Sequence, residues 1–185
     1  MIHDFNERLA FSLGERGKRD MEILKRAIPN CIDVRKTDEE TDRKGIDYIV
    51  TLKGGAEINV DVKARDKGIS RYWKDGREDL ALETWSVCKT EKNEGKIGWT
   101  HSDKTNVDFI LYTFDEADSK NYYLFPYQLL RMAFKRNKDA WIAKYGRRYA
   151  YNSTWSTENV FVPASEIMDA IKAEMKGVIK GSEEN

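Results

Sequence analysis

The fold is decided by residues 45–63, which read GIDYIVTLKGGAEINVDVK. The part from Gly45 to Leu52 is rich in apolar, β-branched and aromatic side chains, which favour an extended chain. Two adjacent glycines then interrupt it in Lys53–Ala56, where they tolerate the positive φ angles of a tight turn. Residues 57–63 alternate between polar and apolar side chains, as a second strand does. The sequence therefore predicts a β-hairpin.

This hairpin brings charged side chains together. A hairpin places the start of its first strand opposite the end of its second strand, so Asp47 is expected to lie beside Asp61. Side chains two residues apart on a strand share a face, so Lys63 lies on the same side as Asp61. Two carboxylates and one ammonium group are therefore expected to be neighbours.

Such a cluster suits metal-assisted cleavage of a phosphodiester. Neighbouring carboxylates repel each other and are costly to desolvate, so a buried pair usually needs a cation. Mg²⁺ (or Mn²⁺) binds oxygen ligands and keeps several waters, which leaves room for a phosphate oxygen and an attacking water. Lys63 would orient or help to deprotonate that water, or stabilise the transition state. The alternative is a hairpin whose polar face is simply solvated.

Further acids lie on both sides of the hairpin. Residues 14–28 predict an amphipathic helix, and Asp20, four residues before Leu24, falls on its apolar stripe. Asp20 is the first candidate for a third acid and Glu15 is the second; the alternative is that these charges complement the helix dipole in a first turn. If residues 79–87 form the third strand of the same sheet, Glu83 borders the metal cluster; otherwise it is a strand acid paired with a lysine.

The order of a helical acid, Asp47 and the tripeptide Asp61-Val62-Lys63 resembles the pattern of the PD-(D/E)XK nuclease superfamily. That superfamily includes restriction endonucleases and archaeal Holliday-junction resolvases. The resemblance covers about residues 14–65. It implies an α/β restriction-endonuclease-like core, with a central mixed β-sheet flanked by helices. It also implies that the Val62 carbonyl completes the metal shell of Asp47 and Asp61, and it suggests dimers for enzymes that cut both strands.

Residues 65–77 are the best candidate for a nucleic-acid contact, because cations can bind phosphates and aromatic rings can stack on unpaired bases. The residues concerned are Arg65, Lys67, Arg71, Tyr72, Trp73, Lys74 and Arg77. The alternative is a charged surface loop anchored by its aromatic residues. A second basic cluster within residues 131–148 is interpreted as the solvated face of a helix. Residues 148–155, RYAYNSTW, either plug an edge of the sheet or touch nucleic acid.

Composition sets the limits of these predictions. The chain of 185 residues is expected to form one domain, residues 1–185, with the motif and sheet in 1–126 and C-terminal helices in 127–185. Its 32 basic and 32 acidic residues cancel, so a nucleic-acid face requires local segregation of charge. Two cysteines without zinc-ligand spacing fit a reducing compartment. No membrane span or signal peptide is recognised, so a cytoplasmic location without membrane contact is expected.

The sequence thus predicts a Mg²⁺-dependent nuclease that hydrolyses DNA, with RNA as substrate left open. The competing interpretation is a catalytically inactive module of the same fold that binds nucleic acid or a protein partner. Oligomeric state and biological pathway are left open as well.

Overall fold

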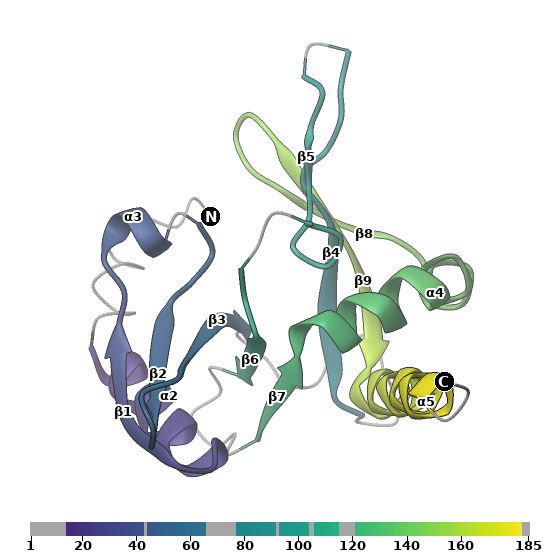
Figure 1. The fold of residues 1–185 in the computed structure, drawn as a ribbon. Helices are drawn as coiled ribbons and strands as arrows, with labels where there is room; N and C mark the ends of the chain where they lie inside the picture. The colour runs from purple at the N-terminus through teal and green to yellow at the C-terminus, as the bar shows by residue number, and fades with distance from the viewer. Residues whose placement is uncertain are drawn as a thin grey trace. The chain divides into compact units, whose positions relative to one another are not determined.

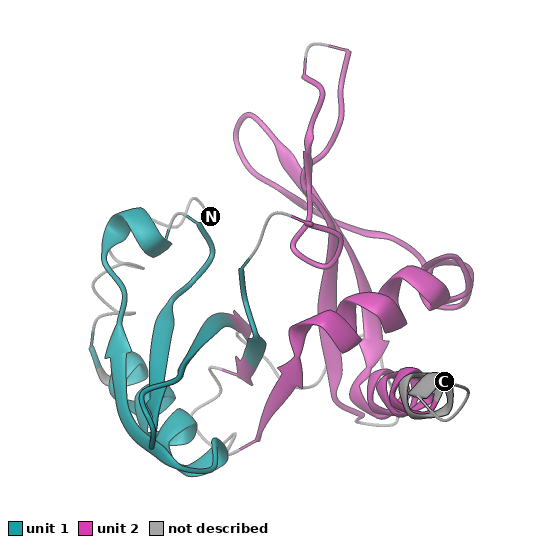
Figure 2. Cartoon of the chain, viewed as in Figure 1, with its two compact units in different colours: residues 1–62, 105–111 teal, residues 63–104, 112–185 magenta. Residues whose placement is uncertain are grey.

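The computed structural model describes residues 14–42, 44–65, 77–91, 93–103, 106–114 and 121–182. The chain forms two compact units, residues 1–62 with 105–111, and residues 63–104 with 112–185 (Figure 2). Its helices and strands, labelled in Figure 1, are α2 (Glu15–Ala27), β1 (Cys31–Lys36), α3 (Glu39–Asp42), β2 (Tyr48–Leu52), β3 (Glu57–Arg65), β4 (Asp79–Val87), β5 (Lys96–Ile97), β6 (Phe109–Phe114), β7 (Tyr122–Pro126), α4 (Tyr127–Tyr145), β8 (Arg148–Tyr151), β9 (Ser156–Pro163) and α5 (Ala164–Ser182).

The predicted hairpin is confirmed. Strands β2 and β3 pair antiparallel, with Tyr48 opposite Val60. The turn between them contains Gly54 at φ +108° and Gly55 at φ +87°, a conformation that side chains with a Cβ rarely adopt. The turn closes where the Leu52 N–H donates to the Ala56 carbonyl at 2.8 Å. The two glycines therefore fix the register that places the ends of the hairpin opposite each other.

The hairpin belongs to a five-stranded sheet of order β1-β2-β3-β6-β7. Strand β1 pairs antiparallel with β2, as β2 does with β3. Strand β6 starts beside the start of β3, because the Asp108 N–H donates to the Asn59 carbonyl and the Asn59 N–H donates to Asp108 Oδ2, both at 2.8 Å. Strands that start side by side run in the same direction, so the sheet is mixed. The predicted α/β class with a mixed sheet is confirmed at this level.

Helix α2 contacts β1 and closes the core of the first unit. Leu24 of α2 is fully buried, and so are Val50 of β2 and Val60 of β3. Strand β1 was not predicted, although Ile32-Asp33-Val34-Arg35 alternates between apolar and polar residues, because the alternating run is only four residues long.

The second unit contains a separate four-stranded sheet of order β5-β4-β9-β8, in which every pairing is antiparallel. The condition under which Glu83 would border the metal cluster is therefore not met, because residues 79–87 form β4 of the second sheet. Helices α4 and α5 contact each other and β9. Helix α4 ends before Gly146, and residues 127–185, which were predicted to form C-terminal helices, include β8 and β9 as well. Within the described ranges, no helix has the length and apolar character needed to cross a membrane.

Candidate active site

Asp47 and Asp61 meet at the open end of the hairpin. Asp47 directly precedes β2, and its N–H donates to the Val60 carbonyl at 3.0 Å. Its Oδ2 accepts the N–H of Val62, the residue after Asp61, at 2.6 Å. The register of the hairpin therefore places the backbone of Asp47 opposite that of Asp61, as predicted. Asp61 is only 5% exposed and Asp47 is half-buried, so the alternative of a simply solvated polar face does not hold here.

The backbone around Asp47 is clamped by Thr37, which follows β1. The Thr37 N–H donates to the Asp47 carbonyl at 3.0 Å. The Thr37 hydroxyl lies 2.5 Å from the Ile46 carbonyl and 3.1 Å from the Asp47 carbonyl. Together with the hydrogen bond from the Val62 N–H, these contacts fix the backbone position of Asp47 and the orientation of its carboxylate.

The helix acid Asp20 lies in the same part of the first unit. It is 3% exposed, and its carboxylate lies 3.9 Å from Arg16 Nε and 3.6 Å from Arg19 Nη2. Burial is the main cause that raises the pKa of the Tyr48 hydroxyl to about 12, and the negative charges of Asp20 and then Asp47 raise it further. Both carboxylates therefore act on one buried hydroxyl, which places the helix acid near the strand acid.

The position of Asp20 decides between the two interpretations of the helix acids. Asp20 lies in the second turn of α2 and faces inward with Leu24, so it is not a first-turn charge that complements the helix dipole. Glu15 is the first residue of α2, and its side chain lies outside the described residues. Sequence reasoning missed Arg16 and Tyr48, although Arg16 precedes Asp20 by one helical turn and Tyr48 follows Asp47 directly.

Lys63 lies two residues beyond Asp61 on β3 and is half-buried. Alternation along the strand places it on the same side as Asp61. Its role beside the two acids stays a prediction, and so does the metal contact of the Val62 carbonyl.

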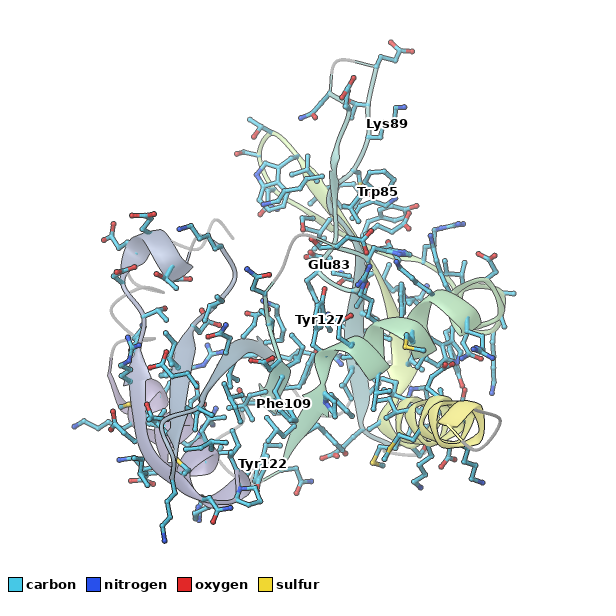
Figure 3. The ribbon with its side chains drawn as sticks, in the orientation of Figure 1. Glu83, Trp85, Lys89, Phe109, Tyr122 and Tyr127 are labelled. Carbon is cyan, nitrogen blue, oxygen red and sulfur yellow. The ribbon has the colours of Figure 1, made fainter. Side chains whose placement is uncertain are left out.

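Glu83 lies on β4, in the second sheet (Figure 3). Its carboxylate accepts a hydrogen bond from the Ser86 hydroxyl at 2.5 Å, and its carbonyl accepts one from the Thr100 hydroxyl. Glu83 was expected to border the metal cluster as part of the hairpin's sheet, and the separate sheet removes the basis for that expectation.

The predicted nucleic-acid segment is described only at its ends. At the first end, Arg65 Nη1 donates to the Asp79 carbonyl at 2.8 Å, and the guanidinium pairs with the fully buried Asp79 carboxylate. The same guanidinium lies 4.5 Å from the centre of the Phe161 ring. These contacts give Arg65 a structural role inside the second unit, and its predicted phosphate contact stays a prediction. At the other end Arg77 is exposed. The remaining predicted contacts lie outside the described residues: Lys67, Arg71, Tyr72, Trp73 and Lys74.

The second basic cluster is largely a set of ion pairs on α4 and after it. Arg136 pairs with Glu174 at 2.8 Å, and Lys144 pairs with Glu166 at 2.7 Å. Arg131 and Lys135 both pair with Asp103. The interpretation as a charged helix surface is consistent with these contacts.

The donors at the hairpin suit a hard cation. Carboxylate and carbonyl oxygens are the ligands that Mg²⁺ binds, and this ion keeps several waters, so it needs few protein ligands. Among the residues that the structure describes, no group of three or more His, Cys, Asp or Glu side chains is arranged to hold a metal ion. A metal at this position would therefore rest on the two hairpin carboxylates and backbone oxygen.

Comparison with known proteins adds no relative: no family model matches the chain, and no curated protein or solved structure matches it.

Proposed function

We propose that the protein is a metal-dependent nuclease that hydrolyses DNA phosphodiester bonds, with its centre at Asp47 and Asp61. The observation that carries this proposal is the 2.6 Å hydrogen bond from the Val62 N–H to Asp47 Oδ2, which ties one carboxylate to the peptide that follows the other. A restriction-endonuclease-like core, the finer description of the mixed sheet, is part of the same proposal.

The energetics of the acids support a functional role. Desolvating a carboxylate costs free energy unless a partner compensates for it, and two adjacent carboxylates add repulsion. The first unit contains Asp20 at 3% exposure, with Arg16 at 3.9 Å and Arg19 at 3.6 Å, and Asp61 at 5% exposure, with Asp47 beside it. Because apolar residues would stabilise the fold better at such positions, the cluster is better explained by chemistry than by stability.

In the proposed mechanism, Asp47, Asp61 and the Val62 carbonyl hold Mg²⁺ or Mn²⁺. The ion would lower the pKa of a bound water and neutralise charge on the phosphate. Lys63 would orient the attacking water and stabilise negative charge in the transition state. Asp20, or Glu15, would accept a hydrogen bond from a second water and so fix its orientation.

The test is incubation of the protein with labelled duplex, single-stranded and branched DNA and with RNA, in the presence of Mg²⁺ or Mn²⁺. We expect cleavage of DNA by the native chain and loss of cleavage in Lys63→Ala. Lys53→Ala is the matched control, because Lys53 is an exposed lysine in the turn of the same hairpin. Unchanged turnover in Lys63→Ala would remove Lys63 from the mechanism. Absence of cleavage on every substrate, with nucleic-acid binding retained, would favour the inactive binding module.

A further inference from the structure

Strand β8 and the turn after it expose large aromatic side chains. Tyr149 is 47% exposed, Tyr151 is 81% exposed and Trp155 is 43% exposed. Tyr149 and Tyr151 lie two residues apart on one face of the strand, with ring centroids 6.2 Å apart and ring planes inclined by 30°. Strand β8 is at the edge of the second sheet, and the Asn152 N–H donates to the Trp155 carbonyl at 2.8 Å to close the turn to β9. Tyr149 and Tyr151 therefore form a pair of neighbouring exposed rings, and exposed aromatic patches mark interaction sites.

The first of these rings is held in place by a buried acid. The Tyr149 hydroxyl donates to Glu158 Oε2 at 2.8 Å, and Glu158 is only 8% exposed. The other oxygen of Glu158 accepts from the Thr84 hydroxyl at 2.7 Å and lies 3.3 Å from Arg147 Nε. The polar end of Tyr149 is therefore anchored while about half of the residue stays exposed. Because the Tyr149 ring is already ordered, little side-chain conformational entropy is lost when a ligand binds to it.

The charge around these rings suits a phosphate-bearing ligand. Residues 140–157 include Lys144, Arg147 and Arg148 but no Asp or Glu, while Lys144 pairs with Glu166 and Arg147 pairs with Glu158. The Arg147 side chain remains 51% exposed although it pairs with Glu158. Cations that border exposed aromatic rings are the combination by which proteins bind single-stranded nucleic acid without reading its sequence.

We propose that Tyr149 and Tyr151 form a stacking surface for unpaired bases of single-stranded nucleic acid, with Arg147 beside the phosphates. The choice of nucleic acid as occupant rests on the proposed nuclease function. The surface lies in the second unit and uses none of the residues assigned to hydrolysis. Bases in a duplex stack on one another, so only unpaired bases present free faces to these rings.

The test measures fluorescence anisotropy of a labelled oligothymidylate with the full chain, in EDTA so that no cleavage occurs, and at fixed salt. Tyr151→Ala should weaken binding about 5- to 100-fold, the range expected for one base stacked on one ring. Tyr151→Phe keeps the ring and should bind within about twofold of the native chain. Tyr122→Ala removes a tyrosine that is 36% exposed on β7 and should leave binding unchanged.

A duplex of the same length should bind Tyr151→Ala and the native chain equally. The proposal is overturned if the native chain does not bind the single strand, if Tyr151→Ala binds it normally, or if the duplex suffers the same loss. Association of two copies of the protein through the exposed edge of β8 would also overturn it. Sedimentation would then show self-association of the native chain that Tyr151→Ala abolishes. The binding assay does not depend on cleavage, so the two proposals can fail separately. If binding behaves as expected but the protein cleaves no substrate, only the nuclease proposal is refuted. If the protein is an active nuclease but Tyr151→Ala binds normally, only the stacking surface is refuted.

Discussion

Asp61 in the first unit and the buried acids of the second unit have different neighbours. In the second unit, buried carboxylates pair directly with arginines: Asp79 pairs with Arg65, and Glu174 lies 2.8 Å from Arg136. In the first unit, Asp20 likewise lies 3.9 Å from Arg16 and 3.6 Å from Arg19, whereas Asp61 lies beside another acid, Asp47, on paired strands. The first arrangement stabilises a fold, whereas two neighbouring carboxylates repel each other and favour the binding of a cation. The same residue type therefore serves structure in one unit and, on our proposal, chemistry in the other.

The largest expected effect is on the cleavage rate, which should depend on Asp61 in the first unit and not on Glu83 in the second. Asp61→Asn should lower the cleavage rate about a thousandfold or more, because it removes a metal ligand and so about 4 kcal/mol of transition-state stabilisation. Glu83→Gln, in the second sheet, should change the rate by less than about twofold. Initial rates on labelled DNA at saturating Mn²⁺ check both variants. A comparable loss in Glu83→Gln would mean that the two sheets share the centre after all.

The next effect concerns stability. Asp79→Ala should lower the free energy of unfolding by about 3–5 kcal/mol, because it leaves the Arg65 guanidinium without its buried carboxylate partner. Glu57→Ala is the control, since it breaks the Arg35–Glu57 pair, whose side chains are 52% and 49% exposed. Such an exposed pair contributes at most about 1 kcal/mol. Urea unfolding compares the two variants, and equal losses would contradict the structural role of Asp79.

In the first unit, replacing an acid should raise the free energy of unfolding slightly or leave it unchanged. Without divalent metal, Asp47→Asn should leave the free energy of unfolding unchanged or raise it by up to about 1 kcal/mol. It relieves repulsion with Asp61, and the amide oxygen can still accept the Val62 N–H. Urea unfolding in EDTA measures this change. A loss as large as that of Asp79→Ala would show that Asp47 is a structural acid like those of the second unit.

The smallest effect is the pH dependence that His101 gives to the second unit. Burial lowers the pKa of His101 below its ordinary 6.5, and the charges of Lys138, Lys135 and Arg131 lower it further. The unfolded chain therefore takes up this proton at a higher pH than the folded chain does. The free energy of unfolding should fall as the pH drops from 7 through 6.5 towards the folded pKa.

His101→Gln removes the titrating group and should flatten this part of the stability curve. Thermal unfolding of both proteins between about pH 5 and pH 8 gives the comparison, in the window where an ordinary histidine titrates. Curves of identical slope would contradict the depressed pKa.

Local patterns in the sequence predicted the parts of the fold that local geometry determines. The double glycine at Gly54 and Gly55 fixed the hairpin, and the hairpin alone places Asp47 beside Asp61. The inward position of Asp20 followed from helical spacing. These features need no knowledge of distant residues.

Features that depend on distant residues were not predictable in the same way. Strand β4 joins the second sheet because it pairs with β9, whose residues lie more than 70 positions later in the chain. Nothing within residues 79–87 indicates that partner, so Glu83 was assigned to the wrong sheet. Arg65 looked like a free cation because its buried partner, Asp79, is known only from tertiary structure.

The measurement that tests the central claim most directly is calorimetric titration of the protein with Mn²⁺, without nucleic acid. The account predicts binding to the native chain, and loss of that binding in Asp47→Asn at unchanged fold, since this variant removes one of the two hairpin carboxylates. Absence of Mn²⁺ binding to the native chain, or equal binding to Asp47→Asn, would contradict a metal centre at Asp47 and Asp61.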